Sequence, residues 1–389
     1  MTTAVYVFLS LLFCLTLETE FTNLSCVPPR LYPVSSFVIS THEIVDVQRP
    51  QEPYSFNPSI IQRLNGKLLF TYRVDILSHN ARNYLNKVGY NILDAVTLHS
   101  VVKSSDARWS HGKGPTLALF DNVGDGRLFH FMGNLYMIYC CGNISTLQQV
   151  SVVRMNIDAS NNLLAMTTGR IYLSYTDGRQ AIEKNWGPFS YQRSKDHPLR
   201  TLYFVHSIVP HRILHHANPA GVNVSHSLLP DHDTVTNMHT AYCTILPEPQ
   251  VPPFWKEWQS LHGGCPAKLV NTGKTWKYLS FFHTRRRFPP PLSTEFSFTS
   301  YAFGAYIFEA HPPFSITHIS SEPIVADTFY SGKRSYIYGI EYVIFPGSFF
   351  IENGTVVLSY GRNDMEAWIM RMDLHGLLSS LVSVQSQRC

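Results

Sequence analysis

The sequence predicts an all-β protein, and specifically a five-bladed β-propeller, on three observations. Aromatic residues make up 13% of the chain and charged residues only 15%, which is typical of a well-packed globular protein rich in strand formers. A polar motif followed by a turn and an alternating apolar strand occurs five times, every ~60–80 residues. Each such unit is an amphipathic sheet too small to bury its own apolar face. Stacking the units radially supplies the missing core and leaves few open strand edges, which favours a propeller.

The five units share one plan, in which polar residues open a first strand, a short turn follows, and a second strand ends in polar side chains. The second unit is the clearest, because Asp125 and Arg127 stand at the head of an alternating run that turns at residues 132–134. The units span residues 54–73, 123–139, 183–206, 263–283 and 342–361.

The connections between these units are expected to be long, because the units recur at more than the usual spacing of propeller repeats. We expect them at residues 75–113, 211–253 and 288–298. Only residues 82–93 have a helical period. A short alternating run at residues 37–47 is expected to pair with the last unit and close the ring.

The N-terminal segment favours the secretory route. Residues 4–17 are almost wholly apolar, and ~14 such residues fit a signal-peptide core better than a spanning helix, which needs ~20. We expect residues 1–20 to be a signal peptide, with a short uncleaved signal anchor as the alternative, ahead of one propeller domain over residues 35–385. Four glycosylation sequons also indicate a secreted or lumenal (ER or Golgi) glycoprotein, at Asn23, Asn143, Asn223 and Asn353.

The cysteines permit disulfides without defining them. Of seven cysteines, Cys14 lies in the apolar segment, and the other six allow fifteen pairings: Cys26, Cys140, Cys141, Cys243, Cys265 and Cys389. The adjacent Cys140 and Cys141, inside a predicted strand, are as readily interpreted as buried thiols.

Several function classes are not supported. A net charge of +4 with scattered basic residues argues against nucleic acid, and the one basic run, 285–287, can hold a phosphate or diphosphate or be a solvated run before prolines. Asp-His-Asp at 231–233 with His239 is too weak a pattern to predict a metal, so none is expected. The segment 262–265, His-Gly-Gly-Cys, lacks a partner base for a cysteine nucleophile. No P-loop or dinucleotide fingerprint is present.

The motifs, taken in order, also resemble a known family. NPSI with a following YR, GDGRLF, EKNWGPF, GGCPAKL with SFFH, YAFGAYIFE, and FPG followed by LSYGRND are similar to segments of glycoside hydrolase family 130, and of related β-1,2-mannosyltransferases. The resemblance covers residues 53–364. It implies a five-bladed propeller, in agreement with the repeat count. It also implies inverting transfer of a β-linked mannosyl group between a glycoside and phosphate, or water in the family's hydrolases.

The resemblance assigns the general acid to Asp125 and its basic partner to Arg127, within the family's Glu-Asp-Pro-Arg motif. Such an acid delivers a proton to the departing glycosidic oxygen. Gly124 and Gly126 stand where the family has Glu and Pro, so Asp125 can instead shape a turn.

The remaining site residues are predicted from their places at motif and strand ends. The resemblance places phosphate binding on Lys184 and His283, because a phosphate dianion must be held by several cationic or hydrogen-bonding partners. Polar side chains at the strand ends suit sugar hydroxyls, and we expect substrate contacts from Asn57, Arg73, Arg127, Asn185, Arg362 and Asp364.

The acceptor of the sugar stays open. No cofactor is expected beyond inorganic phosphate or GDP-mannose as co-substrate, and the expected partner is a β-mannoside or oligosaccharide, with membrane contact only through an uncleaved anchor. The family's phosphorylases use an Arg where this chain has His206-Ser207-Ile208, which favours hydrolysis or a nucleotide-sugar donor. Hydrolysis predicts a second carboxylate, Glu183 or Glu366. The altered loop around Asp125 also allows an inactive, glycan-binding propeller.

Overall fold

The computed structural model of the chain is nearly all β-strand. It describes residues 33–44, 55–62, 65–77, 84–101, 123–141, 149–157, 163–165, 171–177, 184–194, 200–216, 234–258, 260–288, 298–331 and 340–389. The predicted signal segment, Glu183, and three of the four sequons lie outside these residues. In the described part, no helix is long and apolar enough to cross a membrane.

Two of the sheets lie at the two ends of the chain. A three-stranded antiparallel sheet contains β2 (Ser55–Gln62), β3 (Lys67–Leu77) and β4 (Tyr84–Asp94). A four-stranded sheet has the order β1-β21-β20-β19, formed by β1 (Val38–Glu43), β21 (Glu366–Asp373), β20 (Thr355–Arg362) and β19 (Ile344–Glu352). The antiparallel pairing of β1 with β21 confirms that the N-terminal run joins the last unit.

The third sheet combines two groups of strands that follow each other in the chain. The first group is β5 (Val123–Phe131), β6 (Asn134–Cys141), β7 (Gln149–Ile157), β8 (Leu163–Ala165) and β9 (Ile171–Tyr175). The second is β10 (Gly187–Gln192), β11 (Arg200–Ser207), β12 (His211–His216) and β13 (Thr234–Ile245). A parallel pairing of β9 with β13 joins the two groups into one sheet, to which β23 (Gln387–Arg388) adds a tenth strand.

The fourth sheet and the short helices complete the chain. The sheet contains β14 (Lys268–Asn271), β15 (Trp276–Phe288), β16 (Phe298–Glu309) and β17 (Ile316–Ser320), with β18 (Ile340–Tyr342) and β22 (Leu381–Ser383) added at its margins. The helices among the described residues are the 3-10 turn η4 (Glu248–Gln250), α2 (Pro253–Lys256) and α3 (Leu374–Ser379). Asp373 begins α3, because its carboxylate accepts the backbone N–H of Gly376.

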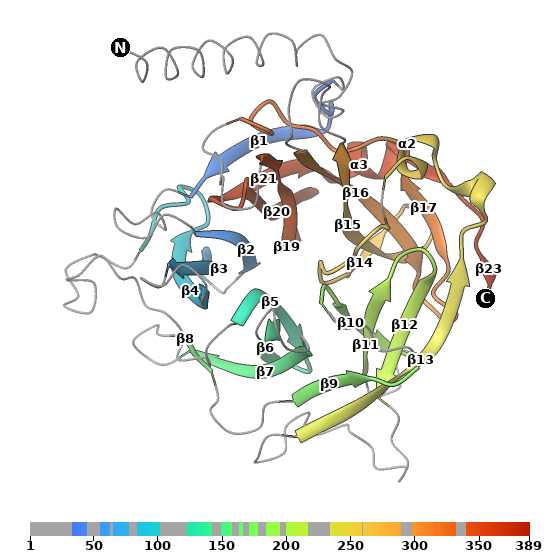
Figure 1. Cartoon of the computed structure of the whole chain (residues 1–389), viewed down its shortest axis with the longest axis horizontal. Coiled ribbons are helices and arrows are strands. Elements are labelled where there is room, and N and C mark those ends of the chain that lie inside the picture. The colour runs from blue at the N-terminus through green and yellow to red at the C-terminus, as the bar shows by residue number, and fades with distance from the viewer. Residues whose placement is uncertain are drawn as a thin grey trace, which may run out of the picture.

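The strand groups are arranged around a common centre (Figure 1). Five hydrophobic clusters fill the spaces between neighbouring groups, and each is built from strands of two groups. One of them packs Phe70 of β3 against Val357 of β20 and so joins the first group to the last. Burial of apolar surface between groups, rather than within one, is what each small amphipathic sheet requires.

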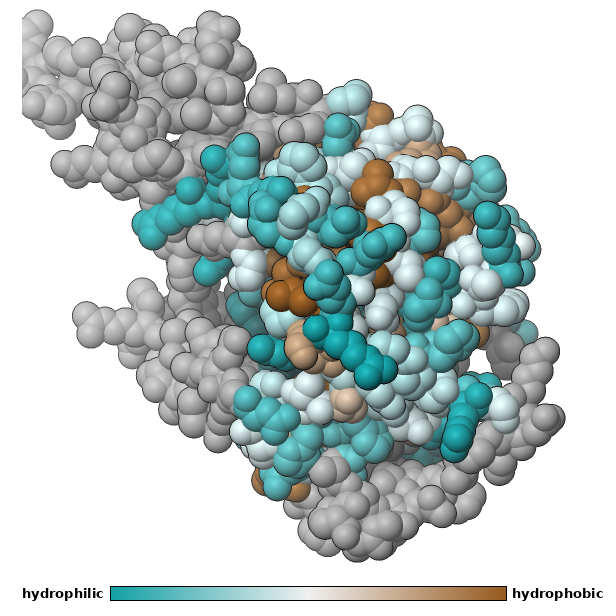
Figure 2. Space-filling view, turned by 90° about the vertical axis from the view of Figure 1, so that its right-hand side faces the viewer, coloured by the Kyte–Doolittle hydropathy of each residue, from teal (hydrophilic) through white to brown (hydrophobic). Residues whose placement is uncertain are grey.

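The C-terminal segment runs back over the earlier strands. β22 pairs with β17, and β23 (Gln387–Arg388) pairs with β13. A disulfide then joins Cys389 to Cys243 of β13, a pairing that the cysteine count alone leaves open. Figure 2 looks onto this side of the molecule, where hydrophilic residues are interspersed with small apolar patches.

Two predictions about the connections are wrong. Residues 84–94, expected in a loop with helical period, form β4, paired with β3 along its whole length. Val88 and Leu93 of β4 are both buried but belong to different clusters, so both faces of the strand are covered and no period of two is visible in the sequence. Residues 211–253, expected as a loop, contain β12 and β13.

Candidate active site

Three polar residues at the start of successive strand groups share the same local backbone geometry. Asn57, Asp125 and Asn185 have φ of 47°, 54° and 63°, and lie in or next to β2, β5 and β10. Asn and Asp adopt this left-handed conformation more readily than other non-glycine residues. The pairing register shifts at the first two of them, which re-aims the side chains. The sequence therefore places amide and carboxyl groups at equivalent points of successive units.

Asp125 is held by two neighbouring groups. Asn57 Nδ2 donates a hydrogen bond to Asp125 Oδ1 at 2.8 Å, and Arg73 Nη1 lies 3.6 Å from the same oxygen. Burial by itself raises the pKa of the Asp125 carboxyl group. The charges of Arg73 and Arg127 and the hydrogen bond outweigh burial, with a smaller contribution from Lys184, so the pKa lies below its usual value. Asp125 is therefore a carboxylate in the unliganded protein.

Arg127 extends the site from β5 to its neighbours. Both of its terminal nitrogens donate to Asn185 Oδ1 at 3.4 Å, and its guanidinium lies 5.0 Å from the centroid of the Phe345 ring. Gly264 approaches so closely, with φ of 120°, that an added Cβ would lie 2.8 Å from Arg127 Cζ. Only glycine meets both conditions. Residues far apart in the chain therefore enclose Arg127, which is 4% exposed.

Three buried polar atoms in this region have no hydrogen-bond partner within the described part of the chain. They are Asn57 Oδ1, Arg127 Nε and His283 Nδ1. Leaving such an atom unpaired costs roughly 1–3 kcal/mol. The arrangement is therefore one that a polar ligand completes.

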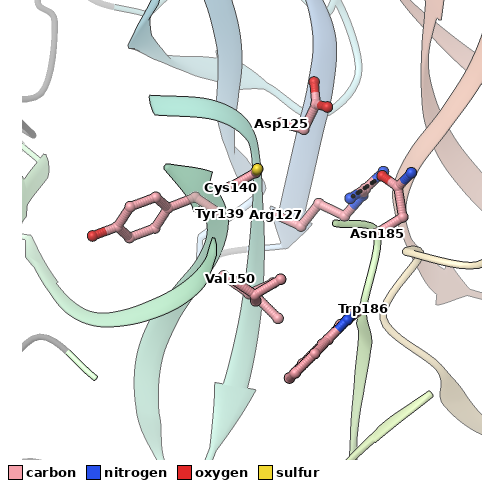
Figure 3. Close-up of a pocket in the computed structure, with 8 residues that line it drawn as sticks. Asp125, Arg127, Tyr139, Cys140, Val150, Asn185 and Trp186 are labelled. Carbon is pink, nitrogen blue, oxygen red and sulfur yellow. Dashed lines mark hydrogen bonds between the residues drawn. The ribbon is translucent and has the colours of Figure 1, made fainter. Parts of the chain in front are cut away.

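A small pocket of about 10 Å³, room for about one water molecule, opens beside Asp125 between β5, β6 and the start of β10. In Figure 3, Arg127 reaches across it to Asn185, with Asp125 at one end and Trp186 at the other. The lining residues are Asp125, Arg127, Ile138, Tyr139, Cys140, Val150, Asn185 and Trp186. Charged and apolar side chains meet here, and the space between them admits a single small polar group.

The predicted phosphate ligands, Lys184 and His283, are close enough for the charge of Lys184 to act on His283. Lys184 is exposed, whereas His283 is buried and its ring packs 4.5 Å from that of Phe345. Burial lowers the pKa of His283 well below its usual value, and the charges of His262, Arg127, Lys184 and Arg285 lower it further. His283 is thus a neutral imidazole in the unliganded protein.

Arg362 and Asp364 are placed differently. The guanidinium of Arg362 is bound to Glu366 and to the carbonyl oxygen of Thr328, at 2.8 Å, so it is engaged within the protein. Asp364 is partly buried in the turn after β20, with φ of 51°. The structure therefore brings Asn57, Arg73, Asp125, Arg127 and Asn185 together. Arg362 and Glu366 are bound to each other instead, so neither is free to act on a ligand.

Sequence reasoning missed several residues of the site. His262 pairs with His283, and Cys140, Trp186 and Phe345 line or cover the region. The motifs that contain Trp186 and Phe345 are recognisable in the sequence, but the direction in which a side chain points cannot be inferred from one motif. Cys265 is buried and its thiol pKa is raised to about 12 by burial, so it is no nucleophile. The described residues contain no group of three His, Cys, Asp or Glu side chains that can hold a metal.

Comparison with known proteins gives fold-level matches. No protein-family model and no curated protein matches the sequence. The chain is similar to a candidate glycoside hydrolase from Parabacteroides distasonis, with a TM-score of 0.52 and 13% identity over 82% of this chain and 87% of that one. It is also similar to MPT-1, a GDP-Man-dependent mannosyltransferase from Leishmania mexicana, with a TM-score of 0.51 and 10% identity over 87% and 91% of the two chains.

The chain has the fold of these proteins. A further neighbour comes from work on the GH130 family of mannoside phosphorylases and its glycoside hydrolases that target β-1,2 mannosidic linkages in Candida mannan, with a TM-score of 0.49 and 13% identity over 90% of this chain and 92% of that one. What this chain shares with the Parabacteroides and Leishmania proteins is the fold.

Proposed function

We propose that the protein is an inverting carbohydrate-active enzyme that transfers or cleaves β-linked mannosyl residues. The observation that carries the proposal is the single carboxylate of Asp125, set among Asn57, Arg73 and Arg127 next to a pocket and to unpaired buried polar atoms. A carboxyl group at the scissile oxygen and bidentate partners for sugar hydroxyls are what glycoside cleavage requires. The motif resemblance and the shared fold support the mannosyl specificity.

The surplus of positive charge favours an anionic co-substrate. Arg73, Arg127 and Lys184 all act on Asp125, whereas no second carboxylate is free beside it among the described residues. Glu366, the described candidate for activating water, is bonded to Arg362 and Trp368. We therefore favour transfer involving inorganic phosphate or a nucleotide-sugar donor such as GDP-mannose over hydrolysis.

An anionic co-substrate also accounts for the proton that Asp125 must deliver. The cations that hold the pKa of Asp125 low keep it ionised in the free protein. Binding of a dianion offsets those cations, which raises the affinity of Asp125 for a proton. In phosphorolysis the carboxyl group then protonates the departing glycosidic oxygen while phosphate attacks the opposite face of the anomeric carbon. In transfer from a nucleotide sugar, the Asp125 carboxylate instead takes the proton of the acceptor hydroxyl as that oxygen attacks and the nucleoside diphosphate leaves.

We further propose that the strand groups are the five blades of a propeller. The support is the five interstrand clusters, each shared by two groups, with one joining the last group to the first. In this proposal the parallel β9–β13 pair joins two neighbouring blades into one hydrogen-bonded sheet. The Cys243–Cys389 disulfide supports the further proposal of a secreted or lumenal location, since disulfides persist in oxidising compartments.

The test is to incubate the purified protein with β-1,2-mannobiose, with and without phosphate, and separately with GDP-mannose and mannose. Product formation only with phosphate, or only with GDP-mannose, identifies the co-substrate, and free mannose without phosphate identifies a hydrolase. Asp125→Asn is expected to abolish turnover in the active condition. Full turnover by Asp125→Asn contradicts the assignment of the acid.

The second candidate is a glycan-binding module without turnover. It is favoured by one observation, the lowered pKa of Asp125, which disfavours the protonated form that an acid needs. This candidate predicts binding of β-1,2-mannobiose by calorimetry with no product in any of the conditions above.

A further inference from the structure

Two histidines from separate segments are joined directly at the edge of the candidate site. The backbone N–H of His262 donates to the carbonyl oxygen of His283, and the N–H of His283 donates back to that of His262, both at 2.8 Å. The two imidazole rings lie 5.6 Å apart, inclined by 30°. His262 precedes β14, and His283 lies within β15. This reciprocal bridge fixes the two rings as a pair.

The pair offers an unfilled hydrogen-bonding position. His283 is 4% exposed, and its Nδ1 has no partner within the described part of the chain. His262 is more accessible, and its Nε2 lies 3.3 Å from Ser260 Oγ. A buried imidazole nitrogen left without a partner is destabilising unless a ligand atom occupies the position.

The charges that reach this pair are all positive. Those acting on His283 come from His262, Arg127, Lys184 and Arg285, and His262 is affected by Lys184 and Arg285. Alternation along β15 places Arg285 on the same face as His283 and Arg286 on the opposite face, where it forms an ion pair with Glu257 at 2.5 Å. The Arg285–Arg287 run is therefore divided between the two faces of β15.

We propose that His262 and His283, supported by Lys184 and Arg285, form a seat for a doubly charged oxyanion of the phosphoryl type, and that the seat binds a proton together with the anion. The proposal rests on the proposed function only in taking this anion to be the co-substrate. It adds His262 and Arg285 to the site, and it adds a pH dependence that the proposed function does not contain.

The proton uptake follows from electrostatics. In the free protein, burial lowers the pKa of His262, and Lys184 and Arg285 lower it further, so the imidazole is neutral near pH 7. A bound dianion compensates these two cations and hydrogen-bonds to the protonated ring, which restores the proton. By linkage, anion affinity rises as pH falls, by up to about tenfold per pH unit while one proton is taken up.

The experiment measures sulfate binding by calorimetry between pH 5.5 and 8. Sulfate stays a dianion over this range, so any pH dependence belongs to the protein. Affinity is expected to rise at least about threefold per unit as pH falls, within the tenfold limit for one proton. The heat is expected to differ between two buffers of unlike ionisation enthalpy by the amount that uptake of one proton requires.

Three variants separate the contributions. His262→Gln is expected to flatten the pH dependence, and Arg285→Gln to weaken binding by about the same factor at every pH. Arg286→Gln, the matched control on the opposite face of β15, is expected to change neither. If His262→Gln does not fold, the buffer-dependent heat of the unaltered protein still tests the proton uptake.

The source of the anion is tested by competition at pH 6. Displacement of sulfate by inorganic phosphate assigns the seat to free phosphate, and displacement by GDP alone assigns it to the phosphoryl groups of a nucleotide. No sulfate binding, no competition by either, or an affinity independent of pH overturns the proposal. None of these readouts uses a mannoside, so proton-coupled binding without turnover would refute the proposed function and leave the seat standing.

Discussion

Two arginine–carboxylate pairs of this protein have the same chemistry but differ in how closely the two charges meet and in how exposed they are. Arg73 Nη1 lies 3.6 Å from Asp125 Oδ1, and the two side chains are 22% and 16% exposed. Arg362 binds Glu366 through Nε at 2.5 Å and also through Nη2, with the side chains 7% and 5% exposed. The first pair is loose and open, and the second is tight and closed.

The surroundings of the Arg362–Glu366 pair explain its role. Trp368 Nε1 donates to Glu366 Oε2 at 3.2 Å, and the guanidinium lies 4.1 Å from the centroid of the Trp368 ring. The remaining nitrogen of Arg362 donates to the carbonyl oxygen of Thr328 and to Ser331 Oγ. Each partner of this pair is satisfied, so it links β20 to Thr328 and Ser331 and has little capacity left for a ligand.

The Arg73–Asp125 pair is left incomplete. Asn57 donates to Asp125 through Nδ2 while its own Oδ1 has no partner among the described residues. An ion pair therefore indicates a binding site when some of its hydrogen-bonding atoms are left without partners. Four substitutions test this contrast between the two pairs.

Asp125→Asn should remove the proton donor and leave the fold intact. We expect kcat in the active condition to fall by about 10²–10⁴-fold, the usual contribution of a positioned acid. The free energy of unfolding should change by no more than about 1 kcal/mol, because the pair is partly solvated. Steady-state kinetics and urea unfolding measure the two, with Asp177→Asn, an exposed carboxylate elsewhere, as the matched control. A large loss of stability with unchanged kcat contradicts the contrast.

Glu366→Gln should have the opposite profile. It leaves the buried Arg362 guanidinium without a counter-charge, and we expect a loss of about 3–5 kcal/mol in the free energy of unfolding. Urea unfolding followed by tryptophan fluorescence measures it. A variant that keeps full stability and selectively loses phosphate-independent mannose release would instead establish Glu366 as the base of a hydrolase.

Arg362→Lys keeps the charge of the closed pair but not its fork geometry. A lysine cannot reach Glu366, Thr328 and Ser331 at once, so we expect a loss of about 1.5–3 kcal/mol, the value of a hydrogen bond to a charged group. Urea unfolding measures this loss. Arg371→Lys is the control, because the Arg371 guanidinium donates to one carbonyl oxygen, that of Ala95. Equal losses at the two positions would remove the geometric argument.

Arg73→Gln should sharpen the role of the open pair. Removing this charge raises the pKa of Asp125, because Arg73 is the largest of the charges that lower it. An acid acts while protonated, so the alkaline limb of the kcat/KM profile should move to higher pH, by about one unit. The carboxylate's contribution to stability, present above its unfolded pKa and lost as pH falls through the lower folded pKa, should shrink at neutral pH. A limb that stays in place or moves to lower pH argues against Asp125 as the acid.

Much of the fold could be predicted because it rests on local rules. The hairpins of the five units and the addition of β1 to the last unit follow from alternation and turn residues. β4 could not be predicted, because burial of both faces removes alternation. The parallel β9–β13 pair and the return of the C-terminal segment to β17 and β13 also carry no local signal, since they join segments far apart in the chain.

The site divides in the same way. The motifs and the family resemblance predicted Asn57, Asp125, Asn185 and His283 as site residues. They also predicted Arg362, but its guanidinium is bound to Glu366 in the folded protein. His262 carried no signal because its role depends on a backbone bridge to a residue twenty-one positions later. The periodicity of a strand can be inferred from its own sequence, whereas the pairing of two distant segments cannot be inferred from either segment alone.

The sequence by itself determined the hairpins of the five units and which polar residues open them, because side-chain alternation and the left-handed preference of Asn and Asp are local properties. Only the tertiary structure decided which charges meet. It set Asp125 among Arg73, Arg127 and Lys184 and so lowered its pKa, and it joined His262 to His283 beside Lys184 and Arg285. Electrostatic interactions depend on distance in space and on burial, and both are properties of the folded chain.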